Sequence, residues 1–158
     1  MTQQHVTDAR LRGLVEVISR LPHVRELGLV VESVRRGGAL LRCDYAPRLI
    51  GNPESGVLHG GVVTTILDTA CGLVSFTIQD EPQASATLDL RIDYMQPAVP
   101  EKPVYGWAEA YRKTRNIVFV RGQAYQDSPD DLIASCVATF MLGSVGFSAA
   151  AVAGEGAG

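Results

Sequence analysis

Hydrophobic residues near the start of the chain recur three or four positions apart, with charged residues between them. This spacing predicts an amphipathic helix from Val6 to Leu21 that lies against a larger body. Pro22 follows at a position typical of a helix end. The apolar positions that define the stripe are Leu11, Leu14, Val15, Ile18 and Leu21.

Two stretches rich in apolar and β-branched residues come next, and they predict strands over Leu27 to Val34 and Ala39 to Tyr45. The segment Arg35 to Gly38 joins them, and its two glycines suit the positive backbone dihedrals of a hairpin turn. From Ala46 to Val57 the chain carries two prolines and two glycines, which predict a loop without regular structure.

The segment from Gly60 to about Ile78 has apolar residues over much of its circumference, which predicts a helix enclosed by other elements. Four strand-like runs follow, separated by turn-forming residues. Long consecutive strands after one enclosed helix predict an antiparallel sheet wrapped around that helix, an α+β fold. The four runs are Ala84 to Met95, Pro103 to Lys113, Ile117 to Gln126 and Leu132 to Leu142.

The length of 158 residues fits a single globular domain. We expect an N-terminal helical segment over residues 1–23, the domain over 24–143, and an Ala- and Gly-rich tail over 144–158 that is predicted to be disordered. The hydrophobic fraction of 46% is somewhat higher than a lone monomer needs, which favours a buried interface between subunits.

Charge and local composition exclude several classes of function. The net charge of -3 gives no electrostatic footprint for nucleic acid, and no segment approaches the roughly 18 apolar residues of a membrane helix. The polar start lacks a signal-peptide core, so we expect a cytoplasmic protein. Cys43, Cys71 and Cys136 are odd in number and far apart, which predicts reduced, buried thiols and no metal site.

The stretch Leu58 to Gly61, Leu-His-Gly-Gly, stands where the enclosed helix is predicted to begin, and Asp68 follows nine residues after His59. A helix N-terminus has unpaired backbone N–H groups and partial positive charge, so it can stabilise an oxyanion. The two glycines remove Cβ atoms that would keep a substrate oxygen away. An acid inside an apolar helix is costly without a task. Together these residues predict a site that handles a carbonyl.

The order of elements and motifs resembles a known family. An Asn-Pro loop, a His-Gly-Gly helix start, an acid nine residues on, and a strand that ends in Asp93 to Pro97 are similar to the hotdog-fold acyl-CoA thioesterases of the phenylacetate-degradation (PaaI-like) branch. The likeness covers about residues 24–143. It implies a homodimer whose two sheets join, often paired again into a homotetramer. It also implies hydrolysis of acyl-CoA without metal or cofactor, coenzyme A being part of the substrate.

The resemblance assigns roles to four residues. The backbone N–H of Gly60 would polarise the thioester carbonyl, and Asp68 would be the nucleophile or the general base for water. Asn52 matches a loop asparagine that places the carbonyl or the water, although it stands seven residues before His59 where several relatives have six. Thr87 falls where relatives place a hydroxyl that assists the water. Asn52 also fits a turn former, and Thr87 also fits ordinary strand packing.

The remaining candidates each have a second interpretation. His59 fits a direct catalytic role, but a histidine in this position more often holds the loop by hydrogen bonding. Gly61 would approach the substrate, or it permits a tight join between loop and helix. Arg112, Lys113 and Arg115 flank a predicted hairpin turn and would meet the phosphates of coenzyme A, although charged residues at turns are commonly just solvated.

The spacing of His59 and Asp68 constrains how a site can form. Nine helical residues make 2.5 turns, so the two side chains point to opposite sides and lie about 13 Å apart along the axis. One chain therefore cannot bring both to a single carbonyl. Two antiparallel helices from two chains can, and they would form two equivalent sites across a twofold axis. Asp68 also fits a hydrogen-bonded structural acid.

Hydrolysis of an acyl-CoA thioester is the leading hypothesis. No Gly-x-Ser-x-Gly elbow is present, which argues against a serine hydrolase. A hotdog hydratase or dehydratase is an alternative, and an enoyl product in place of a free thiol would favour it. An acyl-CoA binding or sensing protein is another alternative, which tight binding without thiol release would favour.

Overall fold

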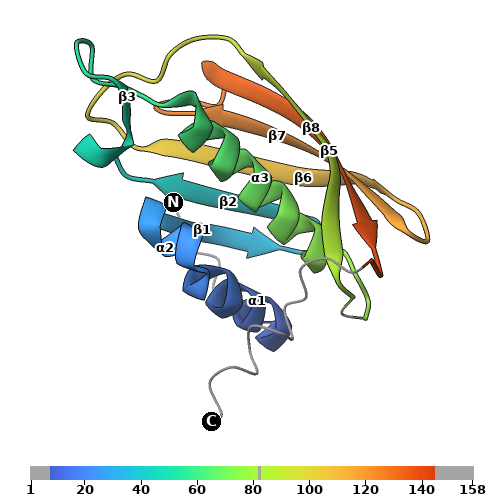
Figure 1. Ribbon diagram of the computed structural model, residues 1–158. Coiled ribbons are helices and arrows are strands. Elements are labelled where there is room, and N and C mark those ends of the chain that lie inside the picture. The colour runs from blue at the N-terminus through green and yellow to red at the C-terminus, as the bar shows by residue number, and fades with distance from the viewer. Residues whose placement is uncertain (1–7, 82, 145–158) are drawn as a thin grey trace.

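The computed structural model describes residues 8–81 and 83–144, and it has one long helix held in the concave side of a sheet (Figure 1). This helix, α3, runs from Gly60 to Thr77. Six strands form the sheet, and every neighbouring pair is antiparallel. The predicted α+β arrangement is therefore confirmed.

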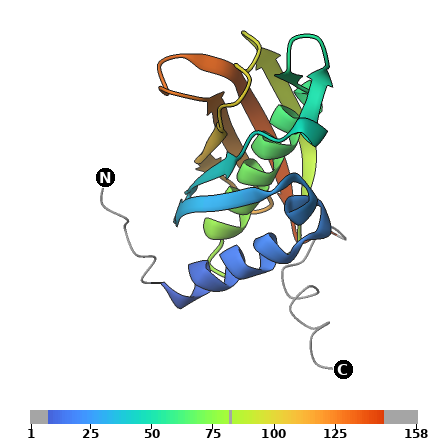
Figure 2. The same cartoon turned by 90° about the vertical axis from the view of Figure 1, so that its left-hand side faces the viewer.

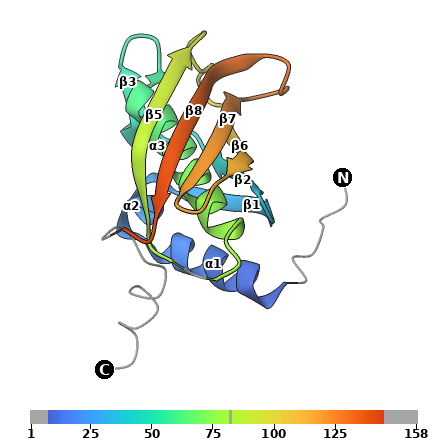
Figure 3. The same cartoon turned by 90° about the vertical axis from the view of Figure 1, so that its right-hand side faces the viewer.

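The sheet has the order β1-β2-β6-β7-β8-β5. The chain leaves α3 at one edge, where it forms β5, then crosses to β6 in the middle and returns through β7 and β8. Figure 3 shows β5 as the outermost strand, beside β8. The bounds are Leu29–Arg35 for β1, Gly38–Cys43 for β2, Ser85–Tyr94 for β5, Val104–Lys113 for β6, Ile117–Tyr125 for β7 and Leu132–Leu142 for β8.

The core lies between α3 and the inner face of the sheet. Fully buried side chains alternate along the strands, such as Val118 and Val120 on β7, because successive residues point to opposite faces. On α3, Ile66 and Leu67 are fully buried. Gly106 on β6 allows the close approach of helix and sheet, since a Cβ atom there would lie 2.3 Å from Cγ2 of Ile66.

Within the described part of the chain, α3 is the one helix whose length and apolar composition match a membrane span. The expectation that no segment approaches such a composition is therefore wrong for α3. The apolar residues of α3 contact the protein interior, because strands surround the helix and 61% of its 18-residue window is buried. A helix enclosed in this way has apolar residues on most of its sides, as a membrane helix does.

The N-terminal helix α1 spans Ala9–Arg20, and the side chain of Asp8 caps it by accepting the N–H of Arg10. It packs against β1 and α3 (Figure 2). Its buried residues include Ile18. The predicted first two residues of this helix lie outside the described ranges. Pro22 lies beyond the end of α1, as predicted, but it also begins a second short helix, α2 (Pro22–Leu27), which the pattern missed. Proline is favourable at a first helical position, where no N–H is needed.

The predicted loop at 46–57 contains regular structure, so that prediction is wrong. A 3-10 turn, η1 (Pro47–Leu49), precedes a small hairpin of β3 (Ile50–Asn52) and β4 (Val57–Leu58). Pro47 begins η1, and Pro53 and Gly56 lie in the turn between the strands, whereas Gly51 lies within β3. Gly56 has a φ of 72°, in the left-handed region that glycine tolerates.

The division of the chain at residues 23 and 24 stays a prediction, and α2 includes residues on both sides of it. The tail predicted over 144–158 lies outside the described residues, apart from Ser144.

Candidate active site

The β3–β4 hairpin fixes the entry to α3. The backbone N–H of His59 donates to the carbonyl of Leu49 at 2.9 Å, and a Cβ atom on Gly51 would lie 2.6 Å from the Cα of His59. His59 caps the helix, because its Nδ1 accepts the N–H of Gly61 at 2.9 Å. A neutral ring that accepts at Nδ1 carries its proton on Nε2. The structure thus gives His59 the loop-holding interaction that the sequence favoured.

Gly60 is the first residue of α3, and it is exposed. Its N–H has no hydrogen-bond acceptor among residues 8–81 and 83–144, as expected for a group in the first turn of a helix. Its carbonyl accepts the hydroxyl of Tyr94 at 2.8 Å, and this hydroxyl is also 2.6 Å from Oγ1 of Thr64. An outward N–H at a helix N-terminus can donate to a developing oxyanion.

Sequence reasoning missed the role of Tyr94 in this arrangement. The residue stood in the strand-end motif that supported the family resemblance, but its hydroxyl was assigned no partner. The structure shows that it joins the end of β5 to the start of α3 through Gly60 and Thr64. It therefore holds the backbone that presents the Gly60 N–H.

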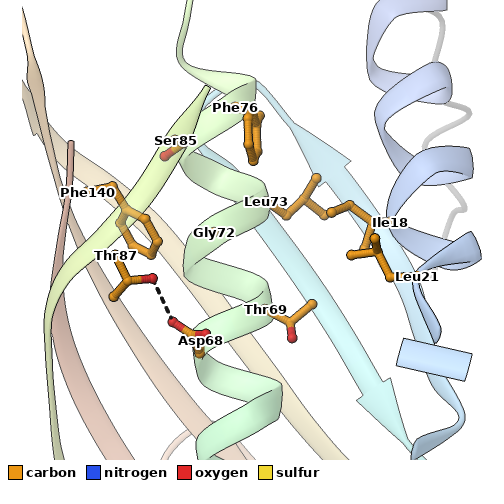
Figure 4. Close-up of a pocket in the computed structure, with 10 residues that line it drawn as sticks. All are labelled: Ile18, Leu21, Asp68, Thr69, Gly72, Leu73, Phe76, Ser85, Thr87 and Phe140. Atoms are coloured by element: carbon orange, nitrogen blue, oxygen red, sulfur yellow. Dashed lines mark hydrogen bonds between the residues drawn. The ribbon is translucent and has the colours of Figure 1, made fainter. Parts of the chain in front are cut away.

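Asp68 lies near the middle of α3 and is partly exposed. Thr87 on β5 donates its hydroxyl to Oδ1 of Asp68 at 3.2 Å (Figure 4). The two side chains line a cavity of about 180 Å³, which also includes Gly72, Leu73 and Phe140. The structure thus brings together two of the predicted residues, an acid and a hydroxyl, beside a mainly apolar cavity.

The other predicted residues lie apart from this pair in the single chain. Gly60 precedes Asp68 by eight helical residues, which corresponds to about 12 Å along the axis. Asn52 is the last residue of β3, and its side-chain oxygen accepts the N–H groups of Glu54 at 3.0 Å and Ser55 at 3.4 Å in the turn that follows. This is the turn-forming interaction that the sequence analysis kept open.

Gly61 lines a groove of about 350 Å³ at the start of α3. His59 lines it as well, and so do two basic residues that sequence reasoning did not single out, His23 and Arg48. They come from α2 and η1, two elements that the pattern did not predict, so nothing in the sequence placed them beside the helix. The Arg48 guanidinium donates to the carbonyl of Glu26, which holds the side chain beside α2.

The predicted basic residues at the β6–β7 turn lie near the opposite end of α3, about 25 Å along the helix from Gly60. Lys113 and Arg115 line a cavity of about 230 Å³ there, together with Asp80. Lys113 Nζ is 3.5 Å from the Asp80 carboxylate, and a hydrogen bond from Arg36 lowers the pKa of Asp80. Arg112 is exposed. Their contact with coenzyme A stays a prediction.

The three cysteines are free and buried, as predicted. Cys71 on α3 and Cys136 on β8 place their sulfur atoms 3.8 Å apart, and this hydrogen bond together with burial raises the pKa of Cys71. Within the described ranges, no three His, Cys, Asp or Glu side chains gather in a way that could hold a metal ion.

Comparisons with known proteins identify the family of this chain. A family model described as the thioesterase superfamily matches residues 55–133. The medium/long-chain acyl-CoA thioesterase YigI of Salmonella typhimurium is 30% identical over 139 residues, which cover 80% of this chain and 88% of that protein.

Solved structures share the fold of this chain. A crystal structure of a Pseudomonas aeruginosa protein is 50% identical, with a TM-score of 0.75, and the match covers 83% of this chain and 97% of that chain. The phenylacetic acid degradation protein PaaI of Thermus thermophilus, solved as a mutant, is 23% identical with a TM-score of 0.68 over 76% and 97% of the two chains, a likeness of fold. The expected hotdog fold and the resemblance to thioesterases are confirmed. The chain belongs to the thioesterase superfamily, as an enzyme that hydrolyses thioesters.

Proposed function

We propose that the substrate is an acyl-CoA thioester and that each catalytic site is shared by two subunits. The Gly60 N–H of one subunit stabilises the thioester oxygen, and Asp68 of the other activates water or attacks the carbonyl. The name of the YigI relative, an acyl-CoA thioesterase, supports the substrate class. The outward N–H at the helix start supports the oxyanion role.

One observation carries the shared site: Asp68 pairs with Thr87 beside a cavity that lies mid-helix, away from the Gly60 N–H of the same chain. A reacting carbonyl has to lie about 3 Å from both an oxyanion donor and the attacking group. The separation of about 12 Å along α3 is too large for that. A second antiparallel copy of the helix brings the N-terminus of one α3 to the middle of the other.

The outer edge of β5 is the surface that we assign to this partner. The strand has ten residues, and its far side pairs with no other strand among the described residues. Three large apolar side chains on or just after it are exposed: Leu88 at 53%, Tyr94 at 51% and Met95 at 57%. A long edge strand with exposed apolar residues favours pairing with another chain. Pairing of β5 with its symmetry mate would join two sheets and set the two α3 helices side by side.

The reaction needs water as its only co-reactant. In the general-base route, Asp68 removes a proton from water while the oxygen of that water bonds to the carbonyl carbon. The tetrahedral intermediate then expels the thiolate of coenzyme A, and the proton held by Asp68 passes to this sulfur. In the nucleophilic route, a carboxylate oxygen of Asp68 displaces the thiolate, and water then hydrolyses the resulting anhydride. The Thr87 hydroxyl orients the carboxylate in either route.

The remaining candidates take positioning and binding roles in this proposal. Asn52, at the end of β3, places the carbonyl or the water through its amide nitrogen, because its oxygen accepts N–H groups of the turn. Gly61 and the basic residues Arg112, Lys113 and Arg115 contact coenzyme A. Pairing of two dimers into a tetramer is also part of the proposal, as implied by the resemblance.

Thiol release from a panel of short, long and aromatic acyl-CoAs tests the function. We expect the natural protein to release coenzyme A, and Asp68→Asn to lose most turnover while it keeps its fold and its dimer. Asp130→Asn is the matched control, since Asp130 is an exposed acid in the turn before β8. Undiminished hydrolysis by Asp68→Asn would contradict the assignment. An enoyl product, or tight binding without thiol release, would contradict hydrolysis itself.

A further inference from the structure

The cavity of about 180 Å³ beside Asp68 is a crevice between α1, α3 and the edge of the sheet (Figure 4). Its lining is divided into two parts. One end is polar and is formed by Asp68, Thr69 and Thr87. The rest is mainly apolar, with Ile18 and Leu21 from the α1 end, Leu73 and Phe76 from α3, and Phe140 from β8.

Ser85 is the polar residue of the lining that lies away from Asp68, and its hydroxyl already has a hydrogen-bond partner. Oγ of Ser85 lies 2.8 Å from Oγ of Ser75, which in turn donates to the carbonyl of Gly72 at 2.7 Å. Asp68 is the one charged residue among the described residues of the lining. A ligand that enters this crevice beyond Asp68 therefore meets methyl groups and aromatic rings, and an apolar ligand is favoured because a polar one would lose hydrogen bonds to water.

We infer that this cavity is the subsite for the acyl chain and that α1 forms the wall that limits the length of that chain. The inference rests on the proposed function, since the thioester carbonyl would lie beside Asp68 and the alkyl tail would extend towards Ile18, Leu21 and Phe76. An engineered cavity of about 150 Å³ takes up benzene, with six carbons. By proportion, this cavity holds about seven carbons, which predicts a preference for acyl chains of about eight carbons.

The wall has a defined position. The Arg10 guanidinium donates to the carbonyl of Asp80 at 3.0 Å and to that of Phe76 at 3.4 Å, which ties α1 to the C-terminal end of α3. Ile18 is only 5% exposed. Because α1 is tethered and packed, the far end of the cavity is a structural limit on the length of the tail.

Gly72 keeps the cavity open along α3. A Cβ atom at this position would lie 3.8 Å from Cε1 of Phe140, an ordinary van der Waals contact, so a larger side chain fits by occupying cavity space. Glycine inside a helix is less favourable than alanine. The absence of a side chain here leaves room for the alkyl tail, one helical turn beyond Asp68.

Two opposite changes test the subsite. Gly72→Leu narrows the cavity, and Ile18→Ala lengthens it. The assay measures kcat/KM for straight-chain acyl-CoAs from about two to about sixteen carbons, a range that extends on both sides of the predicted optimum. We expect Gly72→Leu to lower kcat/KM for octanoyl-CoA about tenfold relative to acetyl-CoA, since one methylene in an apolar pocket changes discrimination by about that factor or more. We expect Ile18→Ala to move the optimum to longer chains.

Gly13→Leu is the matched control, because Gly13 is an exposed helical glycine of α1 and a Cβ atom there would meet nothing within 4 Å beyond the backbone of its own helix. It should leave the chain-length profile unchanged. If Gly72→Leu does not fold by circular dichroism, Gly72→Ala replaces it with the same direction of effect. A chain-length profile that neither the Gly72 nor the Ile18 variant alters would overturn the subsite.

If no acyl-CoA in the series releases a thiol, the proposed function is contradicted instead. Calorimetric binding of the same chain-length series would then test the subsite separately.

Discussion

The oxyanion role of Gly60 can be tested by removing one hydrogen atom from the backbone. Proline at position 60 has no N–H, and the first position of a helix is where proline is best tolerated. The preceding residue also suits it, because His59 has a φ of -62° and a ψ of 133°, in the region that a residue before proline prefers. A Cβ atom at position 60 would approach Tyr94 no closer than 3.7 Å.

The expected effects on activity and stability have opposite signs. Loss of one oxyanion donor lowers kcat by about 100- to 1,000-fold, or about 2.7–4 kcal/mol of transition-state stabilisation. Replacement by proline at a compatible position stabilises a fold by about 0.4–1 kcal/mol, because the unfolded chain loses freedom. We therefore expect Gly60→Pro to be at least as stable as the natural protein and to lose most of its turnover.

The assay is steady-state thiol release with kcat and KM determined separately, together with a thermal unfolding curve. Gly60→Ala is the control, since it adds a side chain but keeps the N–H, and it should retain most of kcat. The oxyanion role is ruled out if Gly60→Pro has a Tm at or above that of the natural protein and keeps a kcat within about threefold of the natural value. A threefold loss corresponds to less than half of the smallest expected loss of transition-state stabilisation.

Three further predictions rest on the described contacts. Thr87→Val, which removes the hydroxyl but keeps the shape, should lower kcat about ten- to hundredfold, since a hydrogen bond to a charged group contributes about 1.5–3 kcal/mol. Thr87→Ser keeps a hydroxyl and should retain most of kcat, and equal losses in both variants would argue against a role for the hydroxyl. The Cys71 thiol is buried, and its raised pKa keeps it neutral near pH 7 to 8, so iodoacetamide should label Cys71 in guanidinium but not in the native protein. Rapid labelling of the native protein would contradict the burial of Cys71. Leu88→Asp places like charges on the edge of β5 in both subunits, so sedimentation should show monomers and thiol release should fall, whereas an intact dimer would contradict β5 as the interface.

The regular elements were predictable because their signals are local. The run predicted as Leu132 to Leu142 is β8 with the same bounds, and the run from Ile117 differs from β7 by one residue at its end. Apolar periodicity and turn-forming residues decide such elements. The enclosed helix was predictable for the same reason, since its apolar residues cover most of its circumference.

The short elements were not predictable because contacts with residues outside each element stabilise them. The β3–β4 hairpin depends on the hydrogen bond from His59 to Leu49 and on the hydroxyl of Tyr45, which donates to the carbonyl of Gly56 at 2.9 Å. None of these pairs has a signal in the local pattern. The order of the strands, with β5 at the edge and β6 in the middle, likewise depends on how the chain crosses the sheet.

The candidate site was predictable in part. The resemblance pointed to Asp68 and Thr87, and the structure joins them by a hydrogen bond. The role of Tyr94 was not foreseen, because a tyrosine near a strand end has many uses and only the fold brings it to Gly60. The cavity wall formed by α1 was also unforeseen, since an amphipathic pattern shows that a helix packs but not against what.

The most direct test of the shared site combines two inactive variants. Asp68→Asn lacks the acid but keeps the amide, and Gly60→Pro lacks the amide but keeps the acid. Subunits of the two, refolded together in equal amounts, form mixed dimers in which one site has both intact groups if the groups come from different chains. If the site is shared, about a quarter of the natural activity returns, because half of the dimers are mixed and each has one intact site of two. Activity no higher than that of the separate variants would contradict the shared site.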